Sequence, residues 1–547
     1  MLRNPLKFAR VALAVFVFAG FTLAFVDFRG FAPPKLGHAL AHTQYVPGLV
    51  SLLVGGGAGA VIFVVGTVIA LVLGRIYCSA ICPLGIFQDV IARISGWFRK
   101  KKKFLPYAKP FTKLRHVFLW GTVAVALAGW GGFALALLDP YSNYGRIVSM
   151  LARPLLTVAN NSIVVFANAA GIQSIYRVDT AWASAGLLIL PAIFLTAIAV
   201  MSALRGRLYC NSICPVGTAL GLVSRFSALR IAIDKTACTK CGDCLRSCKA
   251  QCIDLRTGTV DASRCVACYN CIGACDEQGI HYRFSWKKSP TTTTPAPDLA
   301  TAKAITPNPQ RREFLATLAS GALAGATSLA ARADDDETNS EHNQHCGHSR
   351  RHKPTLVIKG EDSPAVSPPG AASTAQFLDR CTACHLCISA CPTHVLQPAL
   401  FEYGLEGLLR PKLEYSKSYC LFECTRCGEV CPDGAITPLS IEKKSVTQIG
   451  VADLYLGQCV VRTNGTDCAA CSEHCPTKAV TTRPFGDNLR LPVLDQNLCI
   501  GCGACEYACP VKPVKAIIVT GRSTHAQAQK LVEKQAPAPN PVGDFPF

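Results

Sequence analysis

The chain has 547 residues, of which 50% are hydrophobic and only 16% charged, and it carries 30 cysteines and a formal net charge of +20. So apolar a composition argues against a wholly soluble protein and predicts that part of the chain lies in a membrane. Much of the positive charge stands in short loops beside apolar segments, which is typical of membrane topology and does not indicate nucleic acid.

Four apolar stretches are predicted to cross the membrane as helices, because about 30 Å of hydrocarbon requires about 20 helical residues. These stretches are 11–26, 46–73, 117–138 and 182–204. A weaker stretch, 147–170, contains an arginine, a proline and two asparagines, so we expect it to lie along the membrane interface or against the bundle. Residues 1–229 are therefore predicted to form a four-span membrane domain.

Basic residues between the spans predict how the chain is oriented. Nine lysines or arginines and one acidic residue lie between Asp89 and Arg115, so we expect this loop to be cytoplasmic. The N-terminus and the segment after the fourth span are also basic, which places residues 28–45 and 139–180 on the opposite side. The sequence predicts a multi-pass protein of the inner (cytoplasmic) membrane.

A ten-residue motif occurs twice, each time at the predicted cytoplasmic end of an even-numbered span. Gly-Arg-Ile-Tyr-Cys-Ser-Ala-Ile-Cys-Pro at 74–83 recurs as Gly-Arg-Leu-Tyr-Cys-Asn-Ser-Ile-Cys-Pro at 206–215. Two such CxxxCP motifs can bring four thiols together, namely Cys78, Cys82, Cys210 and Cys214. They are candidates for a further metal centre or for a pair of redox-active dithiols. The alternative is that they are small buried side chains that cap helices.

Two cysteine runs follow the last span and predict a two-cluster domain at 230–285. They are Cys238, Cys241, Cys244 and Cys248, then Cys265, Cys268, Cys271 and Cys275. A [4Fe–4S] cube takes one thiolate per iron, and in two-cluster ferredoxins the last cysteine of each run serves the other cluster. We therefore expect one cluster on Cys238, Cys241, Cys244 and Cys275, and another on Cys265, Cys268, Cys271 and Cys248. Cys252 is expected to be a packed thiol.

The composition then changes from that of a folded domain to that of linkers. Residues 286–310 are rich in Thr, Pro and Ala, and residues 334–375 are polar, so both are predicted linkers. Between them Arg311 and Arg312 precede a mild apolar run, so residues 311–333 are interpreted as a twin-arginine-type signal or a possible fifth span. The alternative is an ordinary linker helix that contains two adjacent arginines. Residues 521–547 are predicted to be a disordered tail.

Four more cysteine runs predict a four-cluster domain at 376–520. They comprise Cys381, Cys384, Cys387 and Cys391; Cys420, Cys424, Cys427 and Cys431; Cys459, Cys468, Cys471 and Cys475; and Cys499, Cys502, Cys505 and Cys509. Every run ends in Cys-Pro. Zinc ribbons usually place two CxxC pairs around one metal and fit this pattern less well. Together with the first domain, the sequence predicts six [4Fe–4S] clusters.

These motifs resemble those of known membrane redox proteins. Residues 1 to about 285, with their spans, CxxxCP repeats and two-cluster unit, resemble NapH-type membrane ferredoxins and the related NosR and MauN proteins. Residues 311 to about 520 resemble NapG- or MauM-type exported ferredoxins. The expected fold is multidomain, a four-helix transmembrane bundle plus two ferredoxin-like α+β iron–sulfur domains, the second of them periplasmic. Related four-cluster ferredoxins also imply that the outer two runs exchange fourth ligands with each other, and the inner two likewise.

The resemblance implies that the protein carries electrons between the membrane quinone pool and a redox enzyme or cytochrome outside the cytoplasm. Two other function classes stay open: a maturation factor that supplies electrons to a metalloenzyme, and a cytoplasmic-facing electron-input subunit of a larger complex. No substrate-converting site is evident. Candidates for handling quinol protons are His38, His42, Asp139, Tyr141 and Arg146, although solvated loop side chains are the favoured interpretation of these residues.

Overall fold

The computed structural model describes residues 5–284 and 364–530, apart from 32, 54–56, 99–106, 172, 174–175, 180–183 and 487. The predicted linker at 286–310, the Arg-Arg segment at 311–333 and most of the linker at 334–375 lie outside the described residues. All described residues belong to one structural unit. Contacts between its helical part and its cysteine-rich parts can therefore be followed directly.

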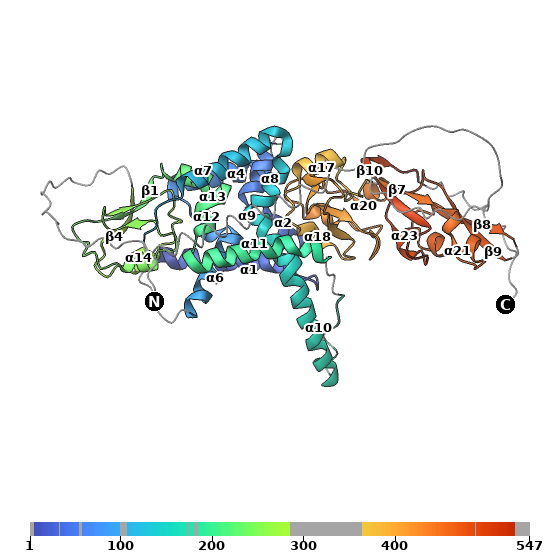
Figure 1. The fold of residues 1–547 in the computed structure, drawn as a ribbon, viewed down its shortest axis with the longest axis horizontal. Coiled ribbons are helices and arrows are strands. Elements are labelled where there is room, and N and C mark those ends of the chain that lie inside the picture. The colour runs from blue at the N-terminus through green and yellow to red at the C-terminus, as the bar shows by residue number, and fades with distance from the viewer. Residues whose placement is uncertain are drawn as a thin grey trace, which may run out of the picture. The chain divides into compact units, whose positions relative to one another are not determined.

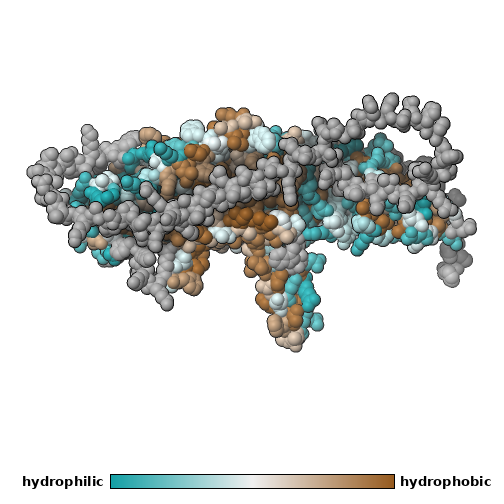
Figure 2. Space-filling model, in the orientation of Figure 1, coloured by the Kyte–Doolittle hydropathy of each residue, from teal (hydrophilic) through white to brown (hydrophobic). Residues whose placement is uncertain are grey.

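Among the described residues, four helices are long and apolar enough to cross a membrane, and they contain 22, 27, 30 and 21 residues. At most 33% of each apolar window is buried, as expected for helices that face lipid. They are α1 (Pro5–Val26); α7 (Thr112–Val125) continued through a π-turn by α8 (Gly131–Leu138); α9 (Pro140–Ile147) continued through a second π-turn by α10 (Arg153–Ala169); and α11 (Ala185–Arg205). Figure 2 shows apolar surface gathered over this helical part of the molecule and along one side of α10.

One predicted span is interrupted. Residues 46–73 form two shorter helices, α3 (Tyr45–Leu53) and α4 (Ala58–Leu73), rather than one. The 16 residues of α4 extend for about 24 Å, less than the hydrocarbon thickness. Gly57, which precedes α4, has a φ of 112°, a conformation that L-residues rarely adopt and that is incompatible with a continuous helix.

The weak stretch 147–170, which was not predicted to be a span, belongs to the longest apolar helix. Pro154 stands in the first turn of α10, directly after the π-turn at Val148–Ala152, and the helix continues past it. Asn161 exchanges hydrogen bonds with the backbone of Val178, so this polar side chain does not interrupt the helix either. Figure 1 shows α10 leaving the other helices and running across the direction of α1 and α11. Length and composition make α10 a candidate span, whereas its direction across α1 and α11 agrees with the predicted position along the membrane interface.

The first cysteine-rich domain follows the membrane helices directly. Its elements are β1 (Leu229–Ile233), α14 (Asp243–Ser247), β2 (Ile253–Asp254), β3 (Thr259–Val260), α15 (Asn270–Gly273) and β4 (Ile280–Phe284). Antiparallel pairing joins β1 to β4, with Ile231 opposite Tyr282, and joins β2 to β3. The helices α14 and α15 pack against each other, and each carries the third cysteine of its run.

The second cysteine-rich domain contains two such units in succession. The first unit has α17 (Thr374–Arg380), α18 (Leu386–Ala390), β5 (Leu396–Pro398), β6 (Pro411–Leu413), α19 (Arg426–Glu429) and α20 (Ile441–Lys444). The second has β7 (Thr447–Leu454), α21 (Val460–Thr463), α22 (Ala470–Glu473), β8 (Val480–Phe485), β9 (Leu489–Leu494), α23 (Ala504–Ala508) and β10 (Ile517–Gln527). Within the units α18 packs on α19, and α22 packs on α23.

The boundaries of this domain are wider than the sequence predicted. Strand β10 continues to Gln527, past the predicted start of the tail at residue 521, because it pairs with β7 as far as Thr447. At the other end Val366 is buried and its carbonyl accepts a hydrogen bond from the Leu413 amide. Part of the predicted linker and part of the predicted tail thus fold with the domain, and residues 531–547 lie outside the described residues.

The two cysteine-rich domains contact opposite ends of the same apolar helices. Near the start of α7, Arg115 donates a hydrogen bond to the Ser263 carbonyl of the first domain at 3.2 Å. Gly132, in α8, lies instead against Arg410 of the second domain. Helix α11 runs the other way: Gly186 at its start lies beside Leu400 of the second domain, whereas the amide of Arg207, just beyond its end, donates to Lys249 of the first.

Candidate redox sites

The two CxxxCP repeats place four buried thiols close together, here named the thiol tetrad: Cys78, Cys82, Cys210 and Cys214. Each repeat forms a short helix, α5 (Tyr77–Ala80) or α12 (Leu208–Ser212), followed by a helix that begins at the Cys-Pro, α6 (Pro83–Trp97) or α13 (Pro215–Ser224). Burial raises the pKa of Cys82, and the thiols of Cys210 and Cys78 raise it further. The repeats therefore bring together the residues that the sequence singled out.

The repeats interlock through their arginines. The Arg75 guanidinium donates to the Cys210 carbonyl at 3.3 Å, and the Arg207 guanidinium donates to the Cys78 carbonyl in the same way. A Cβ atom at Gly85 would overlap the Cys78 carbonyl, and one at Gly217 would overlap the Cys210 carbonyl. Glycine is thus required at this position of both repeats by the close approach of backbone and guanidinium.

Neither the tetrad nor the cysteine runs form a recognisable site for a single metal ion among the described residues. Within the part of the chain that the structure describes, no three His, Cys, Asp or Glu side chains are arranged to hold one ion. An iron–sulfur cube binds each thiolate through a different iron, so its ligands need not converge on one point. An iron–sulfur cluster and a pair of redox-active dithiols therefore both stay open for the tetrad.

The surroundings of the tetrad favour an anionic occupant. Arg75 is 0% exposed and donates to the side-chain oxygen of Asn211 and to the carbonyl of Ser263, each at 2.9 Å. None of the described carboxylates forms an ion pair with it. A buried cation is unstable unless negative charge lies nearby. Thiolates, or a cluster ligated by them, would provide that charge.

In the first cysteine-rich domain the thiols gather in the two predicted sets. Burial raises the pKa of Cys244 to about 11, and its charged neighbours are Cys238, Cys241 and Cys275. Burial also raises the pKa of Cys271, with Cys265, Cys268 and Cys248 beside it. The predicted exchange of fourth cysteines between the runs thus matches the arrangement. Cys252 is 2% exposed, and its Sγ lies 3.7 Å from that of Cys248.

In the second domain the thiols gather in four sets, and the pairing of runs implied by the resemblance is wrong. In each set burial raises the pKa of one thiol, and the three neighbouring thiols raise it further. The sets are Cys381, Cys384, Cys387 with Cys431; Cys420, Cys424, Cys427 with Cys391; Cys459, Cys468, Cys471 with Cys509; and Cys499, Cys502, Cys505 with Cys475. The first run therefore exchanges with the second and the third with the fourth. The hairpins β5–β6 and β8–β9 fold the two runs of each unit onto each other.

The set that contains Cys384 lies against the membrane helices. A Cβ atom at Gly145 in α9 would overlap the Cys384 carbonyl. The neighbouring residue His385 donates a hydrogen bond from Nε2 to the Leu409 carbonyl at 2.8 Å, and its Nδ1 accepts one from the Ser149 hydroxyl at 3.4 Å. Burial lowers the pKa of His385 to about 3, so the ring is neutral here.

Three of the predicted quinol candidates are buried rather than solvated, contrary to the favoured interpretation. Asp139, Tyr141 and Arg146 are 1%, 1% and 2% exposed, because α1, α11 and the Cys384 loop of the second cysteine-rich domain all pack against this segment. His38 and His42 face each other on α2 (Pro34–His42) with 3.0 Å between their Nε2 atoms. None of these residues lines the main cavity.

That cavity has a volume of about 930 Å³ and lies between the end of α1 and the second cysteine-rich domain. Residues that line it include Ala24, Asp27, Phe28, Arg29, Leu386, Ser389, Cys391 and Cys424. Ser389 is 4% exposed, and its Oγ has no hydrogen-bond partner among the described atoms. Sequence reasoning missed Asp27, Arg29 and Ser389, because polar residues just after a span are common and the lining comes from distant parts of the chain.

Comparison with known domain families gives matches over both kinds of site. A family described as a 4Fe-4S binding domain matches residues 56–104 and 187–233, which contain the two CxxxCP repeats. Families described as 4Fe-4S dicluster domains match residues 380–442 and 465–512. These last two matches divide the runs into the same pairs as the structure.

Several known proteins are similar to part of the chain. Methylamine utilization ferredoxin-type protein MauM of Methylorubrum extorquens is 32% identical over 155 residues, which are 27% of this chain and 69% of MauM. Ferredoxin-type protein NapF of Escherichia coli K12 is 29% identical over 154 residues, 28% of this chain and 85% of NapF. Ferredoxin-type protein NapG of the same strain is 30% identical over 152 residues, 26% of this chain and 65% of NapG. No solved structure matches the chain significantly.

Proposed function

Because the chain belongs to the family of ferredoxin-type iron–sulfur proteins that includes MauM, we propose that it carries electrons through a membrane, between the quinone pool and an extracytoplasmic redox enzyme. Each cysteine set would hold a [4Fe–4S] cluster, which when bound takes up or releases one electron. The two cysteine-rich domains are ferredoxin-like α+β units in this proposal, with two clusters in the first and four in the second.

The observation that carries the proposal is the attachment of the two domains to opposite ends of the same apolar helices. Helices α7–α8 and α11 each contact the first domain at one end and the second domain at the other. Helices of this length match the thickness of a bilayer. The basic loop between Asp89 and Arg115 supports a cytoplasmic position for the first domain and a periplasmic position for the second.

The thiol tetrad would be the intermediate site of this relay. On one side Arg75 contacts both the Cys210 carbonyl of the tetrad and the Ser263 carbonyl of the first domain. On the other side the Tyr209 hydroxyl donates to the Leu138 carbonyl at 3.3 Å, immediately before the segment that lies against Cys384. A seventh cluster or a dithiol pair at the tetrad would divide the long step across the bundle into two shorter ones.

The cavity beside α1 is the best place for quinol oxidation in the described part of the chain. Its lining combines apolar side chains, such as Ala24 and Phe28, with the polar groups of Asp27 and Arg29, as a quinol headgroup requires. Quinol oxidation releases two electrons and two protons. Cys391 and Cys424, which line the same cavity, belong to one thiol set, so an electron acceptor would lie next to the headgroup.

A substitution that fills the cavity should slow quinol oxidation selectively. Ala24→Phe is expected to reduce the rate of cluster reduction by a quinol analogue about tenfold or more, equivalent to about 1.4 kcal/mol, and to leave reduction by dithionite unchanged. Leu23→Phe is the matched control, because Leu23 is 44% exposed on the neighbouring face of α1. Equal rates for Ala24→Phe and the unaltered protein in anaerobic stopped-flow measurements would contradict the assignment.

Protease protection tests the proposed topology. In right-side-out vesicles protease should cut residues 364–530 and spare residues 229–284, and inside-out vesicles should give the reverse pattern. Replacing Arg311 and Arg312 with Lys should leave the second domain inaccessible from outside, if residues 311–333 act as an export signal. Digestion of both cysteine-rich domains from the same side would contradict a relay through the membrane.

A further inference from the structure

The two CxxxCP repeats are identical at seven of their ten positions, but they differ in how their arginines are paired. Arg207 forms a two-pronged ion pair with Asp89, with Nε–Oδ1 and Nη2–Oδ2 distances of 2.8 and 2.7 Å. Asp89 stands seven residues after the second cysteine of its repeat, and the equivalent residue of the other repeat is Gly221. The second repeat therefore has no carboxylate with which to neutralise Arg75.

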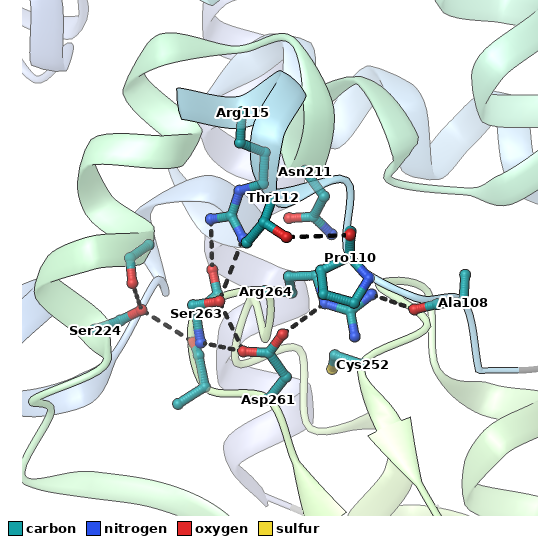
Figure 3. A network of polar contacts seen from close by, with 12 residues as sticks. Ala108, Pro110, Thr112, Arg115, Asn211, Ser224, Cys252, Asp261, Ser263 and Arg264 are labelled. Atoms are coloured by element: carbon teal, nitrogen blue, oxygen red, sulfur yellow. Dashed lines mark hydrogen bonds and ion pairs between the residues drawn. The ribbon is translucent and has the colours of Figure 1, made fainter. Parts of the chain in front are cut away.

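A carbonyl of the first cysteine-rich domain takes the place of the missing carboxylate. A Cβ atom at Gly221 would meet the Ser263 oxygen at 2.6 Å and the Arg115 guanidinium at 2.5 Å, so no larger residue fits. Arg75 donates to this same Ser263 oxygen. Figure 3 shows that Arg115 also points at Ser263, and that the nearby carboxylate of Asp261 is already bound by Ser263 and Arg264.

The positive charge of Arg75 thus lies between two groups of thiols. Its guanidinium is 3.8 Å from the Cys78 Sγ of the tetrad, and Ser263 is two residues before Cys265 of the first domain. Burial raises the pKa of Cys210, and the charges of Arg207 and Arg75 both oppose that rise. Contact with the Cys252 thiol is the main cause that lowers the pKa of Cys265, and Arg75 adds to that effect. The charge of Arg75 therefore affects a thiol of the tetrad and a thiol of the first domain.

We propose that Arg75 is a positioning residue that raises the reduction potentials at the junction between the thiol tetrad and the set of Cys265, Cys268, Cys271 and Cys248. This inference rests on the proposed function, because it requires a bound cluster on at least one side. A buried, uncancelled positive charge stabilises the reduced state, which carries one more negative charge. Reduction adds one electron from quinol or dithionite and moves no proton here, since a guanidinium stays protonated.

The two arginines differ in their ion pairing. Arg207 of the second repeat is paired with Asp89, which follows the first repeat, and Lys249 shares that carboxylate at 3.0 Å. Arg75 of the first repeat donates instead to the Asn211 side chain and to two backbone carbonyls, none of which carries a charge. This difference between two similar repeats is the structural basis of the inference.

An isosteric substitution tests it. Asn211→Asp places a carboxylate 2.9 Å from the Arg75 guanidinium without changing volume, and so reproduces in the second repeat the pairing that Asp89 provides in the first. We expect it to shift the midpoint potential of at least one cluster to a lower value. Asp89→Asn, which frees Arg207, should shift a midpoint to a higher value. Asn168→Asp, on exposed α10, controls for an added charge alone.

The readout is a redox titration of the purified full-length protein, followed by electron paramagnetic resonance, with iron content measured on each sample. Opposite shifts in Asn211→Asp and Asp89→Asn at full iron content are the expected result. Unchanged midpoints in both variants at full iron content would overturn the role of Arg75 and leave the relay intact. Unaltered protein without iron would instead overturn the proposed function.

A second pair of variants covers the case in which Asn211→Asp fails to fold. Arg75→Lys keeps the charge but loses the planar guanidinium, and Arg75→Gln loses both. Arg75→Gln should lower a midpoint, and Arg75→Lys should stay close to the unaltered protein. Equal shifts in these two variants would show that packing, and not charge, sets the potential.

Discussion

Replacing Cys78 and Cys210 with serine is expected to remove about four iron atoms per chain and to stop electron transfer between the two cysteine-rich domains. The tetrad lies between those domains, and its thiols are buried beside a guanidinium that no described carboxylate neutralises. Serine is a much poorer iron ligand than a thiolate and does not supply the required negative charge. Clusters in the two cysteine-rich domains use other cysteines, so they should be retained.

Iron and sulfide analysis, together with stopped-flow reduction, measures both effects. Cys252→Ser is the matched control, since Cys252 is an equally buried cysteine that belongs to none of the predicted ligand sets. Loss of electron transfer with unchanged iron would favour the dithiol alternative. Unchanged iron and unchanged transfer would show that the four thiols only pack the helices.

Cys431→Ser is expected to stop electron transfer between the second cysteine-rich domain and the rest of the protein. Cys431 belongs to the set of Cys381, Cys384 and Cys387, and the Cys384 loop lies directly against α9. Without this set, the remaining clusters of the domain should stay oxidised when the first domain is reduced. Cys509→Ser should abolish a different signal, because Cys509 belongs with Cys459, Cys468 and Cys471, and should leave the set beside α9 reducible.

Electron paramagnetic resonance spectra of the reduced variants distinguish ligand exchange between neighbouring runs from exchange between the outer runs. If the outer runs exchanged ligands, Cys509→Ser would instead damage the cluster of the first run and disconnect the domain. Blocked transfer in Cys509→Ser and normal transfer in Cys431→Ser would therefore contradict the arrangement of the thiols described here.

Local sequence patterns predicted which thiols of the first domain and of the CxxxCP repeats lie close together. The spacing within each cysteine run and the exchange between Cys248 and Cys275 in the first domain depend on short connections, which leave few ways to fold. The CxxxCP repeats likewise predicted a meeting of four thiols, since each repeat follows an apolar helix. In the second domain the pairing of runs depends on two hairpins, which the pairing implied by the resemblance did not take into account.

Long-range packing accounts for what the sequence did not reveal. The polarity of Asp139 and Arg146 suggested a solvated loop, but α1, α11 and residues more than two hundred positions later pack against this segment. The cavity beside α1 is lined in the same way by two distant parts of the chain. The break in the second predicted span was visible in principle, because three consecutive glycines at 55–57 interrupt the apolar run.

Electron flow through sealed vesicles tests most directly whether one continuous relay joins the two domains. The protein is reconstituted with an impermeant reductant inside and an impermeant oxidant outside, and oxidant consumption is followed before and after the orientation of the protein is determined. The unaltered protein should reduce the external oxidant, and the Cys78→Ser, Cys210→Ser double variant should not. Fully loaded protein that passes no electrons between the compartments would contradict the account.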